Sequence, residues 1–199
     1  MAGPVGSVLL ARELNNQETA SLRAMIGQIS LDVHGDSFQV GDVHALGGSY
    51  GPDPHGRPFG VHIARADEER EDEKLLAIAD TFGWLPETSL GFYAMSKQRV
   101  DHEVLGRLCL HFAREFGGLI DFGGALLPPL PADVLQSYLK GTLDWSDVFS
   151  FFETMVLDMP GTVISIEYPV SQTRVWASHV SDAAFMDSWL HHPYFHMIK

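Results

Sequence analysis

The chain has 199 residues, 45% of them hydrophobic, and a formal net charge of −13 from 26 acidic and 13 basic side chains. This length is sufficient to bury a hydrophobic core, so we expect one compact domain over residues 1–199, with possible halves 1–96 and 97–199. The negative charge repels phosphate backbones and anionic lipids, which excludes direct binding to nucleic acid. No stretch approaches the roughly 20 apolar residues of a membrane helix, and the first residues lack a basic signal-peptide start. We therefore expect a cytoplasmic protein without a membrane segment.

The first half of the chain shows six patterned segments, in the order strand, helix, strand, strand, helix, strand. Apolar residues spaced three or four apart indicate helices, and alternating ones indicate strands. The predicted elements are a strand over 5–10, a helix over 17–29, a strand over 37–46 with a bulge at Gly41, a strand over 59–63, a helix after residue 73 that ends near Gly83, and a strand over 90–95. This order is typical of a ferredoxin-like split βαβ unit.

The segment from residue 100 to 125 gives the clearest signal in the chain. Its apolar residues follow a helical spacing as far as Phe116, and Asp101 lies in the first turn, where a carboxylate can cap free backbone N–H groups. Gly117 and Gly118 end the pattern, because glycine readily adopts the left-handed conformation that closes a helix. Residues 119–122 are then predicted to form a short buried strand.

The second half adds helices and a hairpin. The patterns predict helices over 132–140 and 144–156, a hairpin of strands 162–168 and 174–180, and a last helix capped by Ser181 or Asp182. Together these elements predict an α+β fold with a mainly antiparallel sheet, helices packed largely on one side, and a ferredoxin-like βαββαβ first half.

An acidic run precedes the second helix. It contains Asp67, Glu68, Glu69, Glu71, Asp72 and Glu73, interrupted only by Arg70. The run is longer than helix capping requires, so it is either a solvated helix start or a docking surface for cationic side chains. Two aromatic residues close to it in the sequence, Tyr50 in the Gly- and Pro-rich loop 47–58 and Trp84, are candidate anchors for a protein partner.

Metal and cofactor chemistry find little support in the sequence. His191, His192 and His196 are closely spaced, but Pro193 interrupts them and no HExxH pattern is present. We expect no metal and no cofactor, and ordinary hydrogen bonds for these histidines. The single cysteine, Cys109, lies on the apolar stripe of the central helix and is expected to be an inert core residue.

Catalytic motifs are also lacking. The chain contains no GxSxG nucleophile elbow and no GxGxxG or Walker phosphate loop. Asp121 is the most interesting carboxylate, because apolar neighbours in a strand can desolvate it and raise its pKa. A cleft near Asp121, His102 and loop 47–58 therefore remains as an alternative, either in an enzyme or in a small-ligand-binding protein.

Two segments resemble a family of uncharacterised bacterial proteins. The first is a D-H-x-x-L-G helix that leads into G-G-x-x-D-F-G-G, and the second is a closing W-L-x-H-P-x-F-x-x-x-K. The matching residues are Asp101, His102, Leu105, Gly106, Gly117, Gly118, Asp121, Phe122, Gly123 and Gly124, followed by Trp189, Leu190, His192, Pro193, Phe195 and Lys199. Such proteins resemble the small acidic immunity proteins that neutralise polymorphic or secreted bacterial toxins.

Charge, motifs and resemblance together favour a binding function rather than catalysis. We expect an immunity-type protein, not an enzyme, that binds a cognate basic toxin domain through its acidic surface. Long-range attraction would make association fast and salt-sensitive. The identity of the toxin, the surface that binds it and the oligomeric state do not follow from the sequence.

Overall fold

Eight strands form one antiparallel sheet in the computed structural model. It describes residues 3–48, 53–66, 72–127, 134, 136–137, 140, 152–171 and 174–198, with the backbone alone at 72, 169–171 and 174–176. The strands are β1 (Val5–Leu10), β2 (Ser30–His34), β3 (Ser37–Val40), β4 (Arg57–Arg65), β5 (Thr88–Ala94), β6 (Leu119–Asp121), β7 (Val163–Ser171) and β8 (Arg174–Ser181). The helices described in full are α1 (Asn16–Ile29), the 3-10 helix η1 (Val43–Leu46), α2 (Asp72–Phe82), α3 (Arg99–Phe116) and α6 (Ala183–Leu190), and residues 152–156 are helical as well. The α+β class is thereby confirmed.

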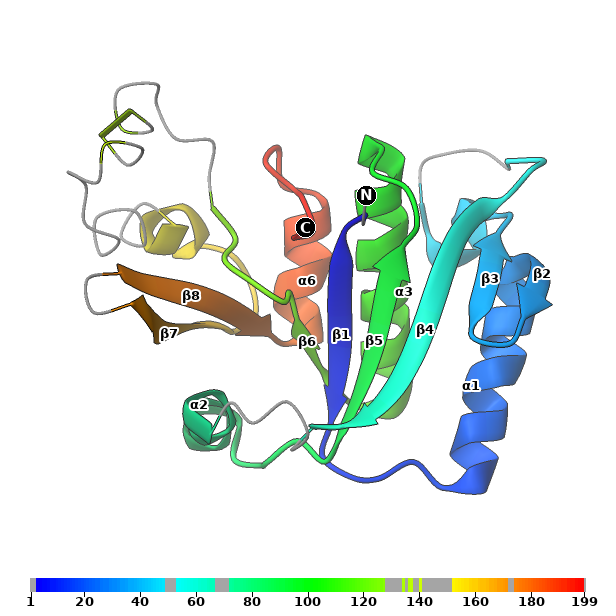
Figure 1. Ribbon diagram of the computed structural model, residues 1–199, viewed down its shortest axis with the longest axis horizontal. Coiled ribbons are helices and arrows are strands. Elements are labelled where there is room, and N and C mark those ends of the chain that lie inside the picture. The colour runs from blue at the N-terminus through cyan, green and yellow to red at the C-terminus, as the bar shows by residue number, and fades with distance from the viewer. Residues whose placement is uncertain are drawn as a thin grey trace.

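The strand order is β2-β3-β4-β5-β1-β6-β8-β7, so the sheet runs through both halves of the chain (Figure 1). In a ferredoxin-like unit the first strand would lie between β4 and β5. Here β5 pairs directly with β4 and places β1 on its other side, so the expected ferredoxin-like order does not describe this sheet. The reason is the path of the chain through α2. After β4 the chain forms α2 and returns as β5 directly beside β4, instead of crossing over β1 to its far side.

Helices cover the two faces of the sheet unequally. On one face α1, α3 and α6 bury the main core, which contains Val8, Leu10, Phe92 and Ile120. On the other face, among the described residues, α2 covers a smaller cluster built on Leu9, Leu119, Ile78, Ile166 and Val180. Consecutive residues of β1 and β6 thus point into different cores, as the alternation of a strand requires. We call the face that carries α2 the outer face.

The central helix α3 confirms the expectation from its periodicity. Its apolar stripe is buried, with Val104, Leu105, Leu108 and Phe112 at 0% exposure. The helix ends at Gly117, whose φ of 70° is left-handed and whose N–H donates to the Ala113 carbonyl. The expected core role of Cys109 is borne out by its complete burial, and burial raises the pKa of the Cys109 thiol well above its ordinary value.

The segment around residues 30–46 differs from expectation. Residues 30–34 form a strand, β2, that the sequence patterns did not predict, and the strand predicted over 37–46 ends at Val40. Asp42 then caps the 3-10 helix η1 by accepting from the His44 N–H. The signal for β2 was the short turn at Gly35, which has a φ of 60° and joins β2 to β3 as a hairpin.

The C-terminal segment returns to the first strand. Ile198 bridges to Val5, whose N–H donates to the Ile198 carbonyl over 2.8 Å. Met197 is 1% exposed in the main core, and Phe195 packs against that core. The C-terminal residues therefore pair with the start of β1, on the side where β6 pairs with Ser7 to Leu9. No helix within the described ranges is long and apolar enough to cross a membrane.

Two glycines with open space around them should respond oppositely to alanine. Gly117 closes α3 at a positive φ, whereas Gly27 lies exposed inside α1, and a Cβ at either position would contact nothing within 4 Å. Gly117→Ala should destabilise the protein by about 1 kcal/mol through backbone strain. Gly27→Ala should stabilise it by about 0.5 to 1 kcal/mol through helix propensity. Urea unfolding of both variants tests this, and equal signs would contradict the assigned helix ends.

Candidate functional site

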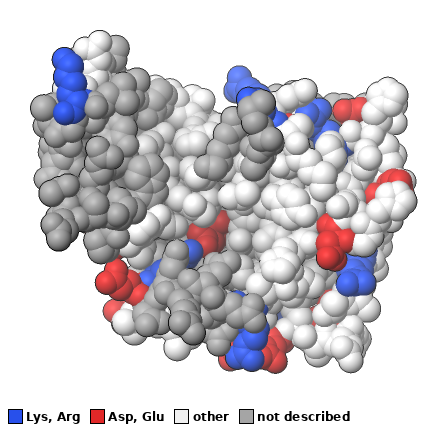
Figure 2. All heavy atoms as spheres, viewed as in Figure 1, with Lys and Arg blue, Asp and Glu red and all other residues white. Residues whose placement is uncertain are grey.

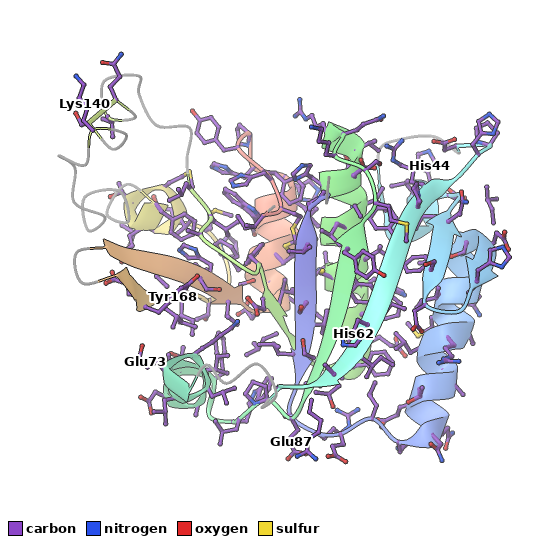
Figure 3. All side chains as sticks on the ribbon, viewed as in Figure 1. His44, His62, Glu73, Glu87, Lys140 and Tyr168 are labelled. Carbon is purple, nitrogen blue, oxygen red and sulfur yellow. The ribbon has the colours of Figure 1, made fainter. Side chains whose placement is uncertain are left out.

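The acidic run lies mostly outside the described residues. Asp67, Glu68, Glu69 and Glu71 fall outside them, and only the backbone of Asp72 is described, in the first turn of α2. Glu73 follows with an exposed side chain (Figure 3). Its position at the start of α2 fits the helix dipole, which favours acids there. The role of the run as a docking surface remains a prediction.

Of the two candidate anchors for a partner, the structure describes only Trp84. Tyr50 lies outside the described residues. Trp84 follows α2 and is half-buried, and its ring packs against the smaller core that joins α2 to the outer face. Part of this side chain thus serves to hold α2 in place.

Asp121 forms a nearly buried ion pair with Lys74. The Lys74 Nζ lies 2.7 Å from Asp121 Oδ2, and the two side chains are 11% and 5% exposed. Asp121 Oδ1 accepts from the Gly123 N–H over 2.9 Å and from the Ser178 hydroxyl over 3.4 Å. The carboxylate therefore links α2, β8 and the turn after β6. Sequence reasoning missed Lys74, although it lies four residues before the buried Ile78 and hence on the apolar face of α2.

His102 is directed to the other side of the sheet. Its Nδ1 lies 2.9 Å from the carbonyl oxygen of Met197 and 3.1 Å from its nitrogen, so the ring binds the C-terminal backbone. Asp121 pairs with Ser7 in register, and Ser7 and Leu9 share the outer face, whereas Met197 lies in the main core. The structure therefore does not bring Asp121 and His102 together as the alternative cleft required.

Three glycines of the first resembling segment, Gly106, Gly118 and Gly124, lie at close contacts. A Cβ at Gly118 would lie 2.7 Å from the Leu9 carbonyl oxygen, and one at Gly124 would lie 2.8 Å from Ile198. Gly106 of α3 faces α6 in the same way, since its Cβ would lie 2.7 Å from Met186. Gly118 needs glycine because the neighbouring backbone approaches too closely for a Cβ, whereas at Gly106 and Gly124 a Cβ would require neighbouring side chains to shift.

A charged network joins β4 to the start of α3. Asp101, whose side chain is 1% exposed, accepts from Arg57 Nε, the Ser96 hydroxyl and the Gln98 N–H, each over 2.6 Å. Burial alone would raise the pKa of Asp101, but these three hydrogen bonds outweigh burial and hold it below its ordinary value. Asp101 was expected to cap the helix, and it does so through Gln98. The partner Arg57, 44 residues earlier, was not predicted.

A half-buried serine and a buried histidine face each other across the β7–β8 hairpin. His179 is 0% exposed; its Nδ1 accepts from the Leu126 N–H, and its Nε2 lies 2.9 Å from the Ser165 hydroxyl. Because Nδ1 accepts, the neutral ring carries its proton on Nε2 and donates to Ser165. A ring in this tautomer cannot take the proton of Ser165 as a general base. Burial lowers the pKa of His179 to about 4, which keeps the ring neutral.

The C-terminal histidines make local contacts, as expected. His192 stacks on Trp189 with ring centroids 4.9 Å apart, and burial lowers the pKa of His192. His191 and His196 bond through Nδ1 to the carbonyl oxygens of Asp187 and Tyr194. Among the residues that the structure describes, no group of three His, Cys, Asp or Glu side chains is arranged to hold a metal ion.

In the part of the chain that the structure describes, these observations define an α+β protein with one antiparallel sheet, in which the buried groups Asp101, Asp121 and His179 are engaged in internal contacts. The chain belongs to a family of unknown function, DUF6368, whose model matches residues 2–199. No curated protein and no solved structure matches it.

Proposed function

We propose that the protein is an immunity-type binding protein, which binds a cationic toxin domain and blocks it. The observation that carries the proposal is the net charge of −13 on a well-packed α+β body. An excess of this size attracts a cationic protein over a distance and orients it during approach. The acidic run at residues 67–73 is the densest source of that charge in the sequence.

The placement of the ionisable groups also supports binding over catalysis. Asp121 is neutralised by Lys74, Asp101 by Arg57, and His179 holds its proton toward Ser165. Each group stabilises a junction between elements. The alternative of an enzyme with a cleft near His102 and Asp121 gains no support from their positions.

Broad uncharged surface is available for contact as well. Figure 2 shows an area over β1, β5 and β4 that carries neither Lys and Arg nor Asp and Glu. On this outer face Tyr93 is 37% exposed and Met95 is 44% exposed. An uncharged patch within an acidic molecule matches the general anatomy of interfaces, in which charges are depleted at the centre.

Copurification tests the proposal. The protein is coexpressed with the product of the neighbouring gene, and we expect retention of that product at low salt and an association rate that falls at least about tenfold as salt is raised. If no cationic protein is retained at low salt, the proposal fails.

A matched pair of variants separates the acidic run from bulk charge. One variant carries the corresponding amides at Asp67, Glu68, Glu69, Glu71, Asp72 and Glu73. The control carries amides at six exposed acids elsewhere, namely Glu13, Asp36, Asp80, Glu87, Glu115 and Glu153. Both lose the same charge, so a larger loss of association rate in the first variant assigns the docking role to the run, and equal losses would refute that role.

A further inference from the structure

A shallow depression lies on the outer face beside the β2–β3 hairpin, and we call it the hairpin depression. It has a volume of about 130 Å³, and its lining includes Asp32, His34, Gln39, Pro58, Phe59 and Met95. Strand register accounts for the shared face: Asp32 pairs with Gln39, and Gln39 pairs with Pro58. These residues thus come from three neighbouring strands and from the end of β5.

The volume restricts what can bind. A cavity of about 150 Å³ holds a benzene molecule, whereas sites for cofactors and drug-sized ligands measure roughly 300 to 1,000 Å³. The hairpin depression therefore has room for one side chain of a partner and not for a nucleotide or a coenzyme.

The charges of the lining select a cation. No Lys or Arg lines the depression, and its acid, Asp32, has a side chain that is 55% exposed. Asp32 Oδ1 accepts from the Val33 N–H over 2.9 Å, and Oδ2 lies 2.8 Å from His34 Nε2. These contacts orient the carboxylate, and each of its oxygens retains a lone pair for a further donor.

The apolar part of the lining suits a long aliphatic stem. Met95 is 44% exposed and Pro58 is half-buried, so both offer apolar surface beside the carboxylate. Arginine and lysine bury their methylene stems on such surfaces while the charged head meets an acid. Arginine fits better, because its planar guanidinium donates to a carboxylate through two N–H groups at once.

Pairing with an added strand is disfavoured here, although β2 is the edge of the sheet. The Val33 N–H already donates to the adjacent Asp32 carboxylate. An added strand needs unpaired backbone groups along the edge. A side chain of a partner suits this edge better than an added strand.

We propose that the hairpin depression receives one arginine side chain of a cationic protein partner, with the guanidinium on Asp32 and the stem against Met95 and Pro58. This inference rests on the proposed function, since it names the point at which such a partner is anchored. Asp32 is not part of the acidic run, and no residue of the run lines the depression, so each can be substituted without the other.

The test uses Nα-acetyl-argininamide as the probe and the full chain labelled with ¹⁵N. Titration followed by NMR should shift the backbone amides of residues 33–39, 59 and 95 with a millimolar dissociation constant. The neutral isostere Nα-acetyl-citrullinamide should bind about five- to tenfold more weakly, since it lacks the charge that a carboxylate recognises. Equal shifts from both probes, or shifts centred elsewhere, would overturn the proposal.

Variants of the hairpin provide the matched controls. Asp32→Asn should weaken the probe about five- to tenfold, and Met95→Ala should weaken it severalfold by removing the apolar wall. Asp36→Asn removes the same charge from the exposed turn of this hairpin, outside the lining, and should leave the affinity unchanged. Equal losses in the Asp32 and Asp36 variants would indicate bulk electrostatics and sink the specific site.

The same variants distinguish this inference from the proposed function. If a copurified toxin binds the Asp32→Asn variant as tightly as the parent protein, the depression is not its anchor, although the proposed function stands. If no cationic protein binds at all, the proposed function fails, while the probe titration still decides whether the depression accepts an arginine.

Discussion

Asp101→Asn is expected to lower the free energy of unfolding by about 3 kcal/mol. The asparagine keeps the shape of the side chain but leaves Arg57, only 13% exposed, without its closest counter-charge. Removing one partner of a buried ion pair is costly because the remaining charge stays desolvated. Urea unfolding at neutral pH, followed by tryptophan fluorescence, measures the loss.

Asp53→Asn is the matched control, because Asp53 pairs with the same arginine. Its Oδ2 lies 3.5 Å from Arg57 Nη1, and its side chain is 32% exposed. A longer and more exposed pair should contribute less than about 1 kcal/mol. Similar losses in the two variants would show that burial of the Asp101 network is not the source of its strength.

Acidification from pH 6.5 to about 4 is expected to remove about 3 kcal/mol of stability through His179. The pKa of His179 is about 4 in the folded protein, against 6.5 for an ordinary histidine. In this range the unfolded chain binds a proton that the folded protein does not. The free energy of unfolding therefore decreases as the pH is lowered from 6.5, and it levels off below pH 4. Urea unfolding at several pH values across the range should reveal the slope.

His179→Gln should flatten that slope while lowering stability at neutral pH, because it removes a buried titrating ring and its contacts. His55→Gln, at an exposed position, is the control and should keep the slope.

His192, whose pKa is also lowered by burial, contributes to the slope with the same sign, so the double variant His179→Gln/His192→Gln should have the flattest dependence of stability on pH. Asp101 affects stability only at lower pH. Because its pKa in the folded protein is below the unfolded value near 3.8, its contribution to the free energy of unfolding is lost only as the pH falls below that value. An unchanged slope in His179→Gln would refute the assignment.

The elements that the sequence could predict are those set by local pattern. The stripe of α3, its left-handed end at Gly117 and the cap of α6 at Asp182 depend on neighbouring residues, and all three agree with expectation. The strand β2 was not predicted because it begins at Ser30, directly after α1, and no Gly or Pro marks the change from helix to strand. A weak local pattern there is completed by pairing with β3.

Pairings between distant segments could not be predicted. The order of β4, β5 and β1 depends on the face to which α2 returns, and no local pattern records that choice. The same choice brings Lys74 to Asp121 across 47 positions of sequence. The alternation of β6, by contrast, places Asp121 on the face of the sheet opposite to His102. The carboxylate and the imidazole of the alternative cleft thus lie on opposite faces of the sheet.

The bridge between Val5 and Ile198 has a consequence for synthesis on the ribosome. On the side where β6 pairs with Ser7, Val8 and Leu9, the start of β1 at Val5 stays unpaired until Ile198, nearly two hundred residues later, has been translated. Contacts of such long sequence separation slow folding, because loop closure precedes any gain from pairing. Formation of this last bridge should therefore be a late step in folding.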